Sequence, residues 1–469
     1  MTSADDARAR ERGLGAVALL VAGTFFMENL DATVITPAIP QMAASFAVPP
    51  VALNTGVSAY MLTLGVFIPA SGWIADRFGA RRVFASAIAL FTIASWLCGH
   101  AGGLAEFVAM RVLQGIGGAL MVPVGRLVVL RVTPKERLVQ AIATLTWPAL
   151  VAPVLGPPLG GLLAQHADWR WIFYLNLPLG LLAIALALRL VPDAREGRRD
   201  PFDWPGFGLC AGALLALLSV ADMLSGPRAP WAGVAGAAAC GVVLLALAVR
   251  HLGRSPHPVL SLAALRVPSF AVTVWGGSLF RMGVSAVPFL LPLMFELGFG
   301  WGPLRAGSML MAVFAGNLLM KVGTTQVLRR FGFRRVLVVN GLFNACAIAA
   351  CALLTPAMPP ALIAMVLFVG GMTRSMQFTA FNTLAFADIE QRAMAAANTL
   401  FSTVFQLAMG LGVALGAMAW HAGTLLAPQA SPVLAFRVAF LLVAAVSLLG
   451  VRDSFALHPQ AGHQVARGA

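Results

Sequence analysis

Apolar segments, each long enough to cross a membrane, follow one another along nearly the whole of this chain. A helix needs about 20 mostly apolar residues to span the hydrocarbon core of a bilayer. Only helices and closed barrels can satisfy their backbone hydrogen bonds in lipid, so the pattern predicts an all-α polytopic membrane protein. We expect fourteen spans, near residues 14–38, 51–71, 83–101, 106–130, 139–163, 171–190, 204–222, 231–249, 269–297, 304–327, 336–355, 360–386, 393–419 and 435–451.

The composition excludes an ordinary soluble protein. Of the 469 residues, 59% are hydrophobic and 11% are charged, whereas about a quarter of the residues of a soluble domain are charged.

The net charge of +14 would suggest nucleic acid in a soluble chain. With a cytoplasmic N-terminus, however, the basic residues gather in cytoplasmic loops, as the positive-inside rule requires. We therefore expect cytoplasmic termini and no nucleic-acid partner. The basic loop residues are Arg77, Arg81, Arg82, Arg131, Lys135, Arg137, Arg189, Arg195, Arg198, Arg199, Arg250, Arg254, Arg266, Arg329, Arg330, Arg334 and Arg335; the other side receives chiefly Arg170, Arg228, Arg305 and Arg437.

One segment near the start of the chain is repeated in its second half. The sequence RFGARRV at 77–83 returns as RFGFRRV at 330–336, an offset of 253 residues. Parallel repeats of this kind are one plan of transporter folds. The offset is longer than six spans of about 20 residues with short loops would need, so two further helices are expected between the halves. We predict a six-helix half at 1–190, a linker with two inserted helices at 191–267, a second six-helix half at 268–452 and a cytoplasmic tail at 453–469.

The first copy of the repeat extends a pattern of glycine, acid and arginine. It resembles the G-x-x-x-D-R-x-G-R-R signature of the major facilitator superfamily, and the second copy has Arg329 where the first has Asp76. A tight glycine turn would hold the acid and the basic cluster at the cytoplasmic mouth, where they can lock one half against the other. A topology-setting loop would explain the arginines, but not Asp76 or the glycines. The candidate gate residues are Gly72, Asp76, Arg77, Gly79, Arg81, Arg82, Arg330, Gly332, Arg334 and Arg335.

Three further motifs narrow the resemblance to the fourteen-span drug:proton antiporters of that superfamily. Residues 30–40, LDATVITPAIP, are similar to the first-span motif of this branch, and 168–180, DWRWIFYLNLPLG, to another of its segments. Gly156, Pro157, Gly160 and Gly161 match its antiporter motif in the fifth span. The resemblance covers essentially the whole chain. It implies a major facilitator fold and proton-coupled export of small molecules by alternating access, most simply multidrug efflux, across a bacterial cytoplasmic (inner) membrane.

The acids of the first span are the candidate proton-coupling residues. Charges inside a membrane are costly and usually functional or paired. Asp31 lies about 9 Å below the outer end of its span at 1.5 Å per residue, and Arg111 in the fourth span lies at a matching depth. The resemblance implies that Asp31 carries the proton and that Arg111 regulates its charge; the alternative is a static ion pair. Glu28, one helical turn before Asp31, is a second proton site, a cation-binding acid or a partly buried acid near a partner. A Glu28–Arg281 pair across the halves is a further hypothesis.

The basic residues inside the spans leave the substrate open. Arginine suits carboxylates, so a proton-coupled exporter of an organic anion, or of a metal–carboxylate complex such as iron citrate, is the alternative function. Arg126 and Lys321 are interpreted as reaching the cytoplasmic face with their long side chains. The candidate substrate-binding residues are Asn29, Gln114, Arg281 and Arg374.

Other classes of membrane protein fit less well. No phosphate-binding G-x-x-x-x-G-K-[ST] loop occurs, as a nucleotide-driven pump would require. Repeated halves with a gate loop favour alternating access over a channel, and no cluster of catalytic or metal-ligating side chains is evident. We expect no enzyme activity, no cofactor, no metal and no nucleotide, and a monomer whose partners are protons, its substrate and lipid.

Overall fold

The computed structural model of the chain describes residues 3–192, 200–225, 230–426 and 432–462, and within these ranges it contains helices and no strand. Thirteen helical segments of the described part are long and apolar enough to cross a membrane. The all-α polytopic prediction is confirmed, whereas the count of fourteen spans and the sidedness of the termini stay predictions. Arg195, Arg198, Arg199 and Arg228 of the predicted loops, and the tail beyond residue 462, lie outside the described residues.

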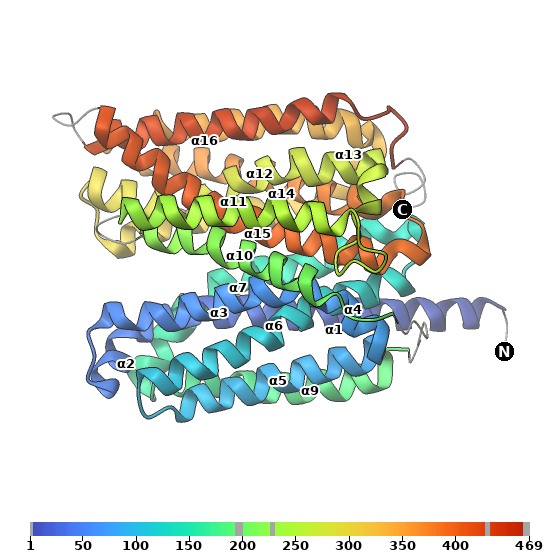
Figure 1. Cartoon of the computed structure of the whole chain (residues 1–469). Helices are drawn as coiled ribbons and strands as arrows, with labels where there is room; N and C mark the ends of the chain where they lie inside the picture. Colours follow the sequence, from blue (N-terminus) through green and yellow to red (C-terminus); the bar gives the residue numbers. More distant parts are fainter. Residues whose placement is uncertain (1–2, 193–199, 226–229, 427–431, 463–469) are drawn as a thin grey trace.

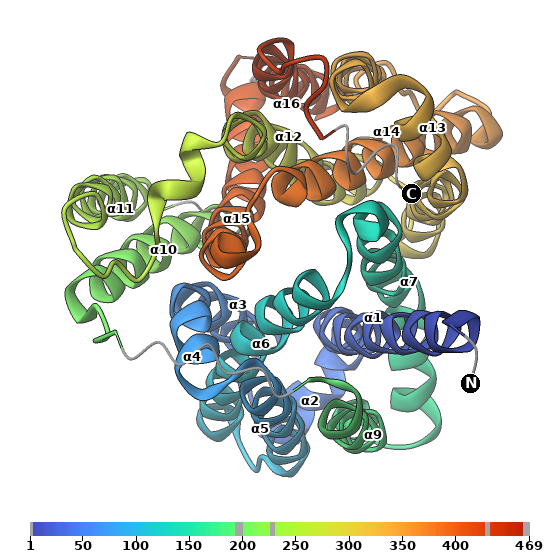
Figure 2. The ribbon, with the colours of Figure 1, turned by 90° about the vertical axis from the view of Figure 1, so that its right-hand side faces the viewer.

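Two groups of helices lie side by side, and a third pair lies against their junction (Figures 1 and 2). The first group comprises α1 (Ser3–Val34), α2 (Ile39–Phe46), α3 (Asn54–Phe67), α4 (Ser71–Phe78), α5 (Ala80–His100), α6 (Leu104–Val132), α7 (Leu138–His166), α8 (Trp171–Tyr174) and α9 (Asn176–Leu190). The second group comprises α12 (Pro268–Leu293), α13 (Pro303–Cys351), α14 (Pro360–Ala387), α15 (Met394–Leu426) and α16 (Pro432–Phe455).

The helices between the groups are α10 (Trp204–Ser225) and α11 (Trp231–Leu252). They pack on each other, and α10 also packs on α3 of the first group and on α15 of the second. Ser58 of α3 donates a hydrogen bond to Asp222 of α10. The inserted pair therefore contacts both groups along one side of their junction.

Helix α13 covers two of the predicted spans, 304–327 and 336–355. Its backbone leaves the helical conformation between them, at Gly332. The φ of Gly332 is 75° and its ψ is 161°. Gly79 has a φ of 89° at the junction of α4 and α5. Both are the glycine of the repeated RFG sequence, and only glycine adopts such a positive φ without strain. The repeat thus makes the same sharp turn in each group.

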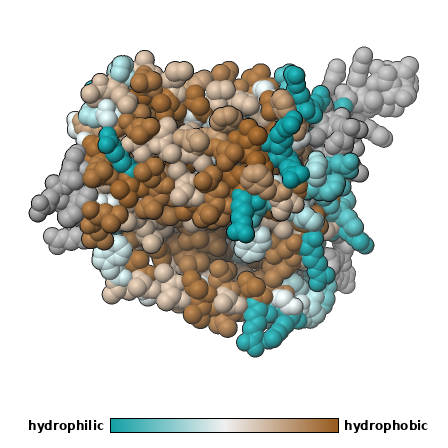
Figure 3. Space-filling view, turned by 90° about the horizontal axis from the view of Figure 1, so that it is seen from above, coloured by the Kyte–Doolittle hydropathy of each residue, from teal (hydrophilic) through white to brown (hydrophobic). Residues whose placement is uncertain are grey.

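The surface has a hydrophobic middle and a hydrophilic end. Figure 3 shows apolar side chains over the middle of one face, and hydrophilic ones gathered at one end. At that end α1 begins and α16 ends (Figure 1). We call it the basic end, defined by the turn at Gly79 with Arg77 and Arg81 and by Arg131 at the end of α6. This distribution is the one that a protein surrounded by lipid requires.

The two groups touch near the basic end. Asn398 of α15 donates a 2.8 Å hydrogen bond to the carbonyl of Pro123 in α6. Gln391, just before α15, donates to the carbonyl of Arg131 at 3.1 Å. Gly72 of α4 lies so close to Thr399 that an added Cβ would overlap the threonine side chain. The structure thus has the first and second groups in close contact at the basic end.

Candidate functional site

The centre of the first group holds a buried ion pair. A nitrogen (Nη1) of Arg111 lies 2.6 Å from Oδ2 of Asp31, and neither side chain is exposed to solvent. The proximity that the sequence predicted from the matching depths is therefore present. A charge pair taken out of water is held only if further hydrogen bonds satisfy the remaining atoms.

Two carboxamides supply those further hydrogen bonds to Asp31. Gln114 donates to Oδ1 at 2.9 Å and Asn176 to the same oxygen at 3.0 Å. Asn176 also donates to Ser95, whose hydroxyl donates to the carbonyl of Phe173. Three hydrogen-bond donors, from Arg111, Gln114 and Asn176, therefore face the two oxygens of this carboxyl group.

Arg111 retains unused hydrogen-bonding capacity. Its Nη1 donates to Asp31 and, at 2.7 Å, to Gln114, while its Nε and Nη2 have no hydrogen-bond partner in the described part of the chain. Its guanidinium lies 4.4 Å from the centre of the Tyr60 ring. A favourable contact of the cation with the ring face contributes to holding it there.

Close helix packing sets these side chains in place. A Cβ added at Gly115 of α6 would overlap the backbone of Tyr60 in α3, and one at Gly117 would overlap the backbone of Phe91 in α5. Small residues let membrane helices approach to backbone contact. The glycines that follow Arg111 and Gln114 thus bring α6 against the helices that surround Asp31.

The predicted antiporter motif packs α7 against α1. A Cβ at Gly156 would overlap the side chain of Thr33, and one at Gly160 would overlap the backbone carbonyl of Val34. Pro157 lies inside α7. At Gly161 the nearest atom to an added Cβ would be 3.9 Å away, in Pro37. The motif therefore places α7 beside the segment of α1 that follows Asp31.

Glu28 lies one helical turn before Asp31, close to the ion pair of Asp31 and Arg111. Its Oε2 is buried without a hydrogen-bond partner among the described residues. The charges of Asp31 and of Arg126 both act on it. Within the described residues no ion pair joins Glu28 to Arg281, so the hypothesis of a pair across the halves is not met in this conformation.

Arg126 and Lys321 do not extend to the membrane surface, contrary to the interpretation from the sequence. Arg126 donates to Ser402 of the second group at 3.3 Å. Lys321 donates to Thr146 of the first group at 2.8 Å and to Thr379 at 2.6 Å. The long side chains instead cross the junction of the two groups, because the rotation of their helices directs them there.

Arg281 lies beside Arg126 at the same junction. Its Nη1 donates to the carbonyl of Thr273 at 3.1 Å and its Nη2 to Asn382 at 3.2 Å. The guanidinium of Arg281 lies 5.0 Å from the ring centre of Phe401, and that of Arg126 lies 5.1 Å from the same centre. Two guanidinium groups therefore lie near one aromatic ring between the halves.

Two other candidate substrate residues have different surroundings: Asn29 bonds to its own helix, and Arg374 lies inside the second group. Asn29 donates to the carbonyl of Phe25 on its own helix at 2.8 Å. Arg374 lines a cavity within the second group. Gln114 belongs to the Asp31 cluster.

The gate residues lie at the basic end as a turn and a basic surface. Asp76 forms an ion pair of 2.8 Å with Arg131 of α6. Arg334 donates to the carbonyl of Phe455 at 3.1 Å, which ties the second copy of the turn to α16. The remaining predicted arginines are exposed or partly exposed; they are Arg77, Arg81, Arg82, Arg330 and Arg335.

The first inserted helix begins at a polar cluster next to the gate turn. Asp203 accepts hydrogen bonds from Gly206 N at 3.0 Å, His251 at 2.8 Å and Val259 N at 3.2 Å. Burial alone would raise the pKa of Asp203, but these hydrogen bonds outweigh it and hold that pKa below its ordinary value. The adjoining carbonyl of Asp200 accepts from Trp73 of α4 at 3.0 Å, so the inserted pair is attached to the gate segment.

Several of these polar residues were not predicted from the sequence. No pattern in the sequence indicates a role for Asn176, although it lies in the 168–180 motif, and none does so for Ser95, Asn382, Ser402 and Asn398. Uncharged polar residues are common in membrane helices, and only the three-dimensional packing distinguishes these.

Two groups of membrane-spanning helices, a buried carboxylate–arginine pair in one of them and contacts between the groups near one end define a polytopic transporter. Residues 21–413 match the Major Facilitator Superfamily, and the chain belongs to that family.

Comparisons with individual proteins agree with this family assignment. The chain is 39% identical over 396 residues to the "Putative multidrug resistance protein MdtD" of Serratia proteamaculans, covering 84% of this chain and 83% of that one. It is 37% identical over 401 residues to the protein of that name from Citrobacter koseri, covering 85% and 84%. Among solved structures, the fold resembles the proton:xylose symporter XylE (TM-score 0.65, 15% identity, 98% and 99% covered) and the human organic anion transporter MFSD10 (TM-score 0.66, 14% identity, 95% and 99% covered).

The chain is thus a multi-pass transporter of the bacterial inner membrane, and not an enzyme.

Proposed function

We propose that this transporter is a proton-coupled exporter of small molecules, a multidrug efflux antiporter that works by alternating access. The observation that supports this most is the solvent-free pair of Asp31 and Arg111 with its two carboxamide donors. A buried ion pair contributes little to stability compared with apolar residues, and ionisable groups inside membranes are usually functional. The names of the MdtD relatives support a drug substrate, and the antiporter motif at Gly156 and Gly160 supports exchange.

The proposed cycle follows from how a proton changes this cluster. Protonation of Asp31 would remove its charge and convert one acceptor oxygen into a donor. Gln114 and Asn176 would then have one acceptor fewer, and Arg111 would lose its counter-ion. The surplus cation would favour a conformation in which water or another group reaches it. Proton entry from outside would in this way return the empty transporter to the inward-open state.

The experiment is substrate-driven proton exchange in proteoliposomes. An Asp31→Asn variant keeps the side-chain shape and removes the titratable group, so coupled proton movement is expected to fall at least a hundredfold. Asp388→Asn is the matched control, because Asp388 is an exposed acid just after α14 and its loss is expected to change exchange less than twofold. Normal exchange in Asp31→Asn would refute the carrier assignment. Glu28→Gln in the same assay distinguishes a second proton site, which would halve the protons moved per substrate, from a bystander.

One observation favours the second candidate, export of an organic anion or of a metal–carboxylate complex such as iron citrate. Arg126 and Arg281 both face Phe401 between the two groups, and no carboxylate is ion-paired with either within the described residues. Guanidinium groups bind carboxylates with two parallel hydrogen bonds. An anion entering this junction would find two such groups.

Proteoliposomes challenged in parallel with a lipophilic cation and with citrate, with and without iron, separate the candidates. A proton response to the cation alone supports multidrug efflux. A response to citrate alone, lost in Arg281→Gln and Arg126→Gln, supports the anion. The same vesicles, labelled for single-molecule photobleaching, test the expectation of a monomer.

A further inference from the structure

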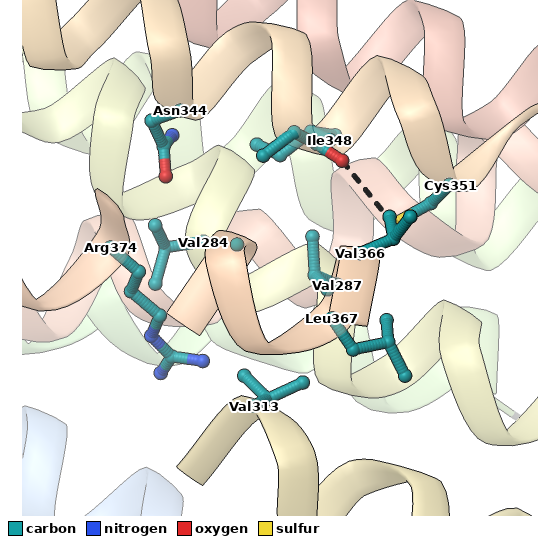
Figure 4. Close-up of a pocket in the computed structure, with 11 residues that line it drawn as sticks. Val284, Val287, Val313, Asn344, Ile348, Cys351, Val366, Leu367 and Arg374 are labelled. Carbon is teal, nitrogen blue, oxygen red and sulfur yellow. Dashed lines mark hydrogen bonds between the residues drawn. The ribbon is translucent and has the colours of Figure 1, made fainter. Parts of the chain in front are cut away.

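A cavity lies inside the second group of helices. About 390 Å³ of space, its open mouth included, lies among its side chains. A space of this size between side chains suits a slender group. Figure 4 shows its lining from α12, α13 and α14, which includes Val284, Val313, Leu367, Cys351, Asn344 and Arg374.

This cavity is the repeat counterpart of the proton-coupling cluster. At the offset of 253 residues, Val284 takes the place of Asp31, and Leu367 that of Gln114. Ile348 corresponds likewise to Ser95, Val313 to Tyr60 and Cys351 to Cys98. The same position in the fold is thus polar and filled in the first group, and apolar and partly empty in the second.

One charged side chain lies at this apolar space. Arg374 lines it, and Figure 4 shows its guanidinium and the carboxamide of Asn344 toward one end of the cavity, with Cys351, Val366 and Leu367 toward the other. Arg374 is partly buried, and it makes no hydrogen bond or ion pair with the described residues. An arginine at membrane depth requires a partner, and here the protein provides none with a negative charge.

We propose that this cavity binds a single-chain aliphatic carboxylate. The carboxylate would accept hydrogen bonds from Arg374, for which the guanidinium fork is suited. The aliphatic chain would replace the empty space between Val284, Val313 and Leu367, where it is removed from polar groups. This site is independent of the proposed proton coupling, because it uses none of the residues around Asp31.

The depth of Arg374 selects a free carboxylate over an intact membrane lipid. Arg374 lies 14 residues from the start of the 28-residue helix α14, or about 21 Å along it at 1.5 Å per residue. That position is near the middle of the span. The headgroup of a phospholipid would have to leave its interface to reach it, whereas a free single-chain acid can enter whole.

The test is equilibrium binding of radiolabelled decanoate to the purified full chain in nanodiscs of an ether-linked phosphatidylcholine, which releases no fatty acid. Decanol and butyrate, as competitors, supply the chain and the carboxylate separately, and each is expected to compete at least tenfold more weakly than decanoate. Arg374→Gln is expected to weaken decanoate binding at least tenfold. Val284→Phe fills the cavity and is expected to abolish binding. Val322→Phe, the same change on α13 at a side chain that is 81% exposed, is the matched control and should bind as the unmodified protein does.

A second measurement does not depend on how these variants fold. Cys351 lines the cavity, so decanoate should slow its alkylation by a maleimide at least fivefold in a chain whose other four cysteines are replaced by serine. Unchanged alkylation would overturn the proposal. So would decanoate binding in Arg374→Gln and in Val284→Phe that equals binding to the unmodified protein. Protection by added anionic phospholipid but not by decanoate would overturn it as well, in favour of a lipid site.

Discussion

Asp31 and Arg111 depend on each other, since each is the only counter-ion that the described structure places on the other. Replacing Arg111 by glutamine leaves an aspartate buried without a cation, and breaking a buried pair in this way costs about 3–5 kcal/mol. We therefore expect Arg111→Gln to melt well below the unmodified protein at pH 7. The double variant Asp31→Asn/Arg111→Gln removes both charges and should recover most of that loss.

Thermal melting of the two single variants and the double variant in one detergent measures this coupling. The double variant should remain inactive in proton exchange despite its recovered stability. If the two single losses simply add in the double variant, the pair is not energetically coupled and the electrostatic account of the cluster is wrong.

At this scale the sequence predicted charged residues better than neutral ones. A charge in a membrane span is rare enough to be informative, so the matching depths of Asp31 and Arg111, together with the first-span motif, predict their proximity. Asn176 and Ser95 complete the same cluster, but a neutral polar residue in a span carries no comparable signal. Arg126 and Lys321 were misplaced because sequence gives a residue's depth along its helix and not the direction of its side chain.

Among the helices, the contact of α1 with α7 depends on glycines of α7, whose lack of a side chain allows the two backbones to approach. The Cβ of an alanine at Gly160 would overlap the backbone of Val34. At the adjacent Gly161 it would make only an ordinary van der Waals contact with Pro37. Overpacking typically costs about 1–3 kcal/mol, whereas alanine is favoured over glycine in a helix by about 1 kcal/mol. Gly160→Ala is thus expected to lower the melting temperature and impair exchange, and Gly161→Ala to leave both intact or raise the melting temperature slightly.

Melting curves and proton exchange of these two single variants form the comparison. If Gly160→Ala and Gly161→Ala had equal melting temperatures and equal exchange, α1 and α7 would not be in backbone contact in the membrane. The antiporter motif would then not act by packing these two helices together.

The start of α10 allows a prediction about pH. The pKa of Asp203 is held below its ordinary value by its hydrogen bonds, so this acid binds a proton less readily in the folded protein than in the unfolded chain. Its stabilisation is therefore complete above the ordinary aspartate pKa, near 4, and is lost as the pH falls through the lower, folded value. Asp203→Asn keeps one acceptor oxygen and replaces the other by an NH2 group, which cannot accept the hydrogen bond from Val259 N. The substitution should therefore cost about 1 kcal/mol.

The difference in melting temperature between the unmodified protein and Asp203→Asn should accordingly be present at pH 7 and shrink below about pH 4. A difference that already shrinks between pH 7 and pH 6 would contradict this account.

The helices themselves were largely predictable, because lipid leaves few alternatives for an apolar segment. The break at Gly332 was predicted as a loop between two spans, and the structure places there a single glycine with positive φ. What the sequence did not show is that α10 packs on both α3 and α15. Residues 204–218 of that helix are all apolar, so the pattern there does not distinguish lipid from protein neighbours.

For the whole molecule, the repeat at 253 residues predicted two related halves but not which conformation they adopt. The choice depends on a small number of polar contacts between the groups near the basic end, made by residues such as Asn398 and Gln391. These contacts join segments more than 250 residues apart, and each is one of many that similar polar residues could make. Sequence reasoning without related sequences cannot select among them.

The contact of Asn398 with Pro123 leads to a prediction about that conformational balance. Asn398→Ala leaves the buried Pro123 carbonyl without this donor when the basic end is closed, at a cost of about 1–3 kcal/mol. Part of the cost is offset, because the Oδ1 of Asn398 has no hydrogen-bond partner among the described residues and is removed as well. We expect a net shift of about 1 kcal/mol toward the open basic end, or about fivefold in population.

Distances between spin labels report this shift. Labels at Phe78→Cys and Phe331→Cys, on a background without other cysteines, use two exposed side chains that follow the repeated arginine in each half. In Asn398→Ala the longer distance should gain population. Asn340→Ala is the matched control, because Asn340 donates to Thr373 within the second group and its loss should leave the distances unchanged. If both variants shift the distances equally, general loosening of the helices explains the effect; if neither does, this hydrogen bond does not hold the basic end closed.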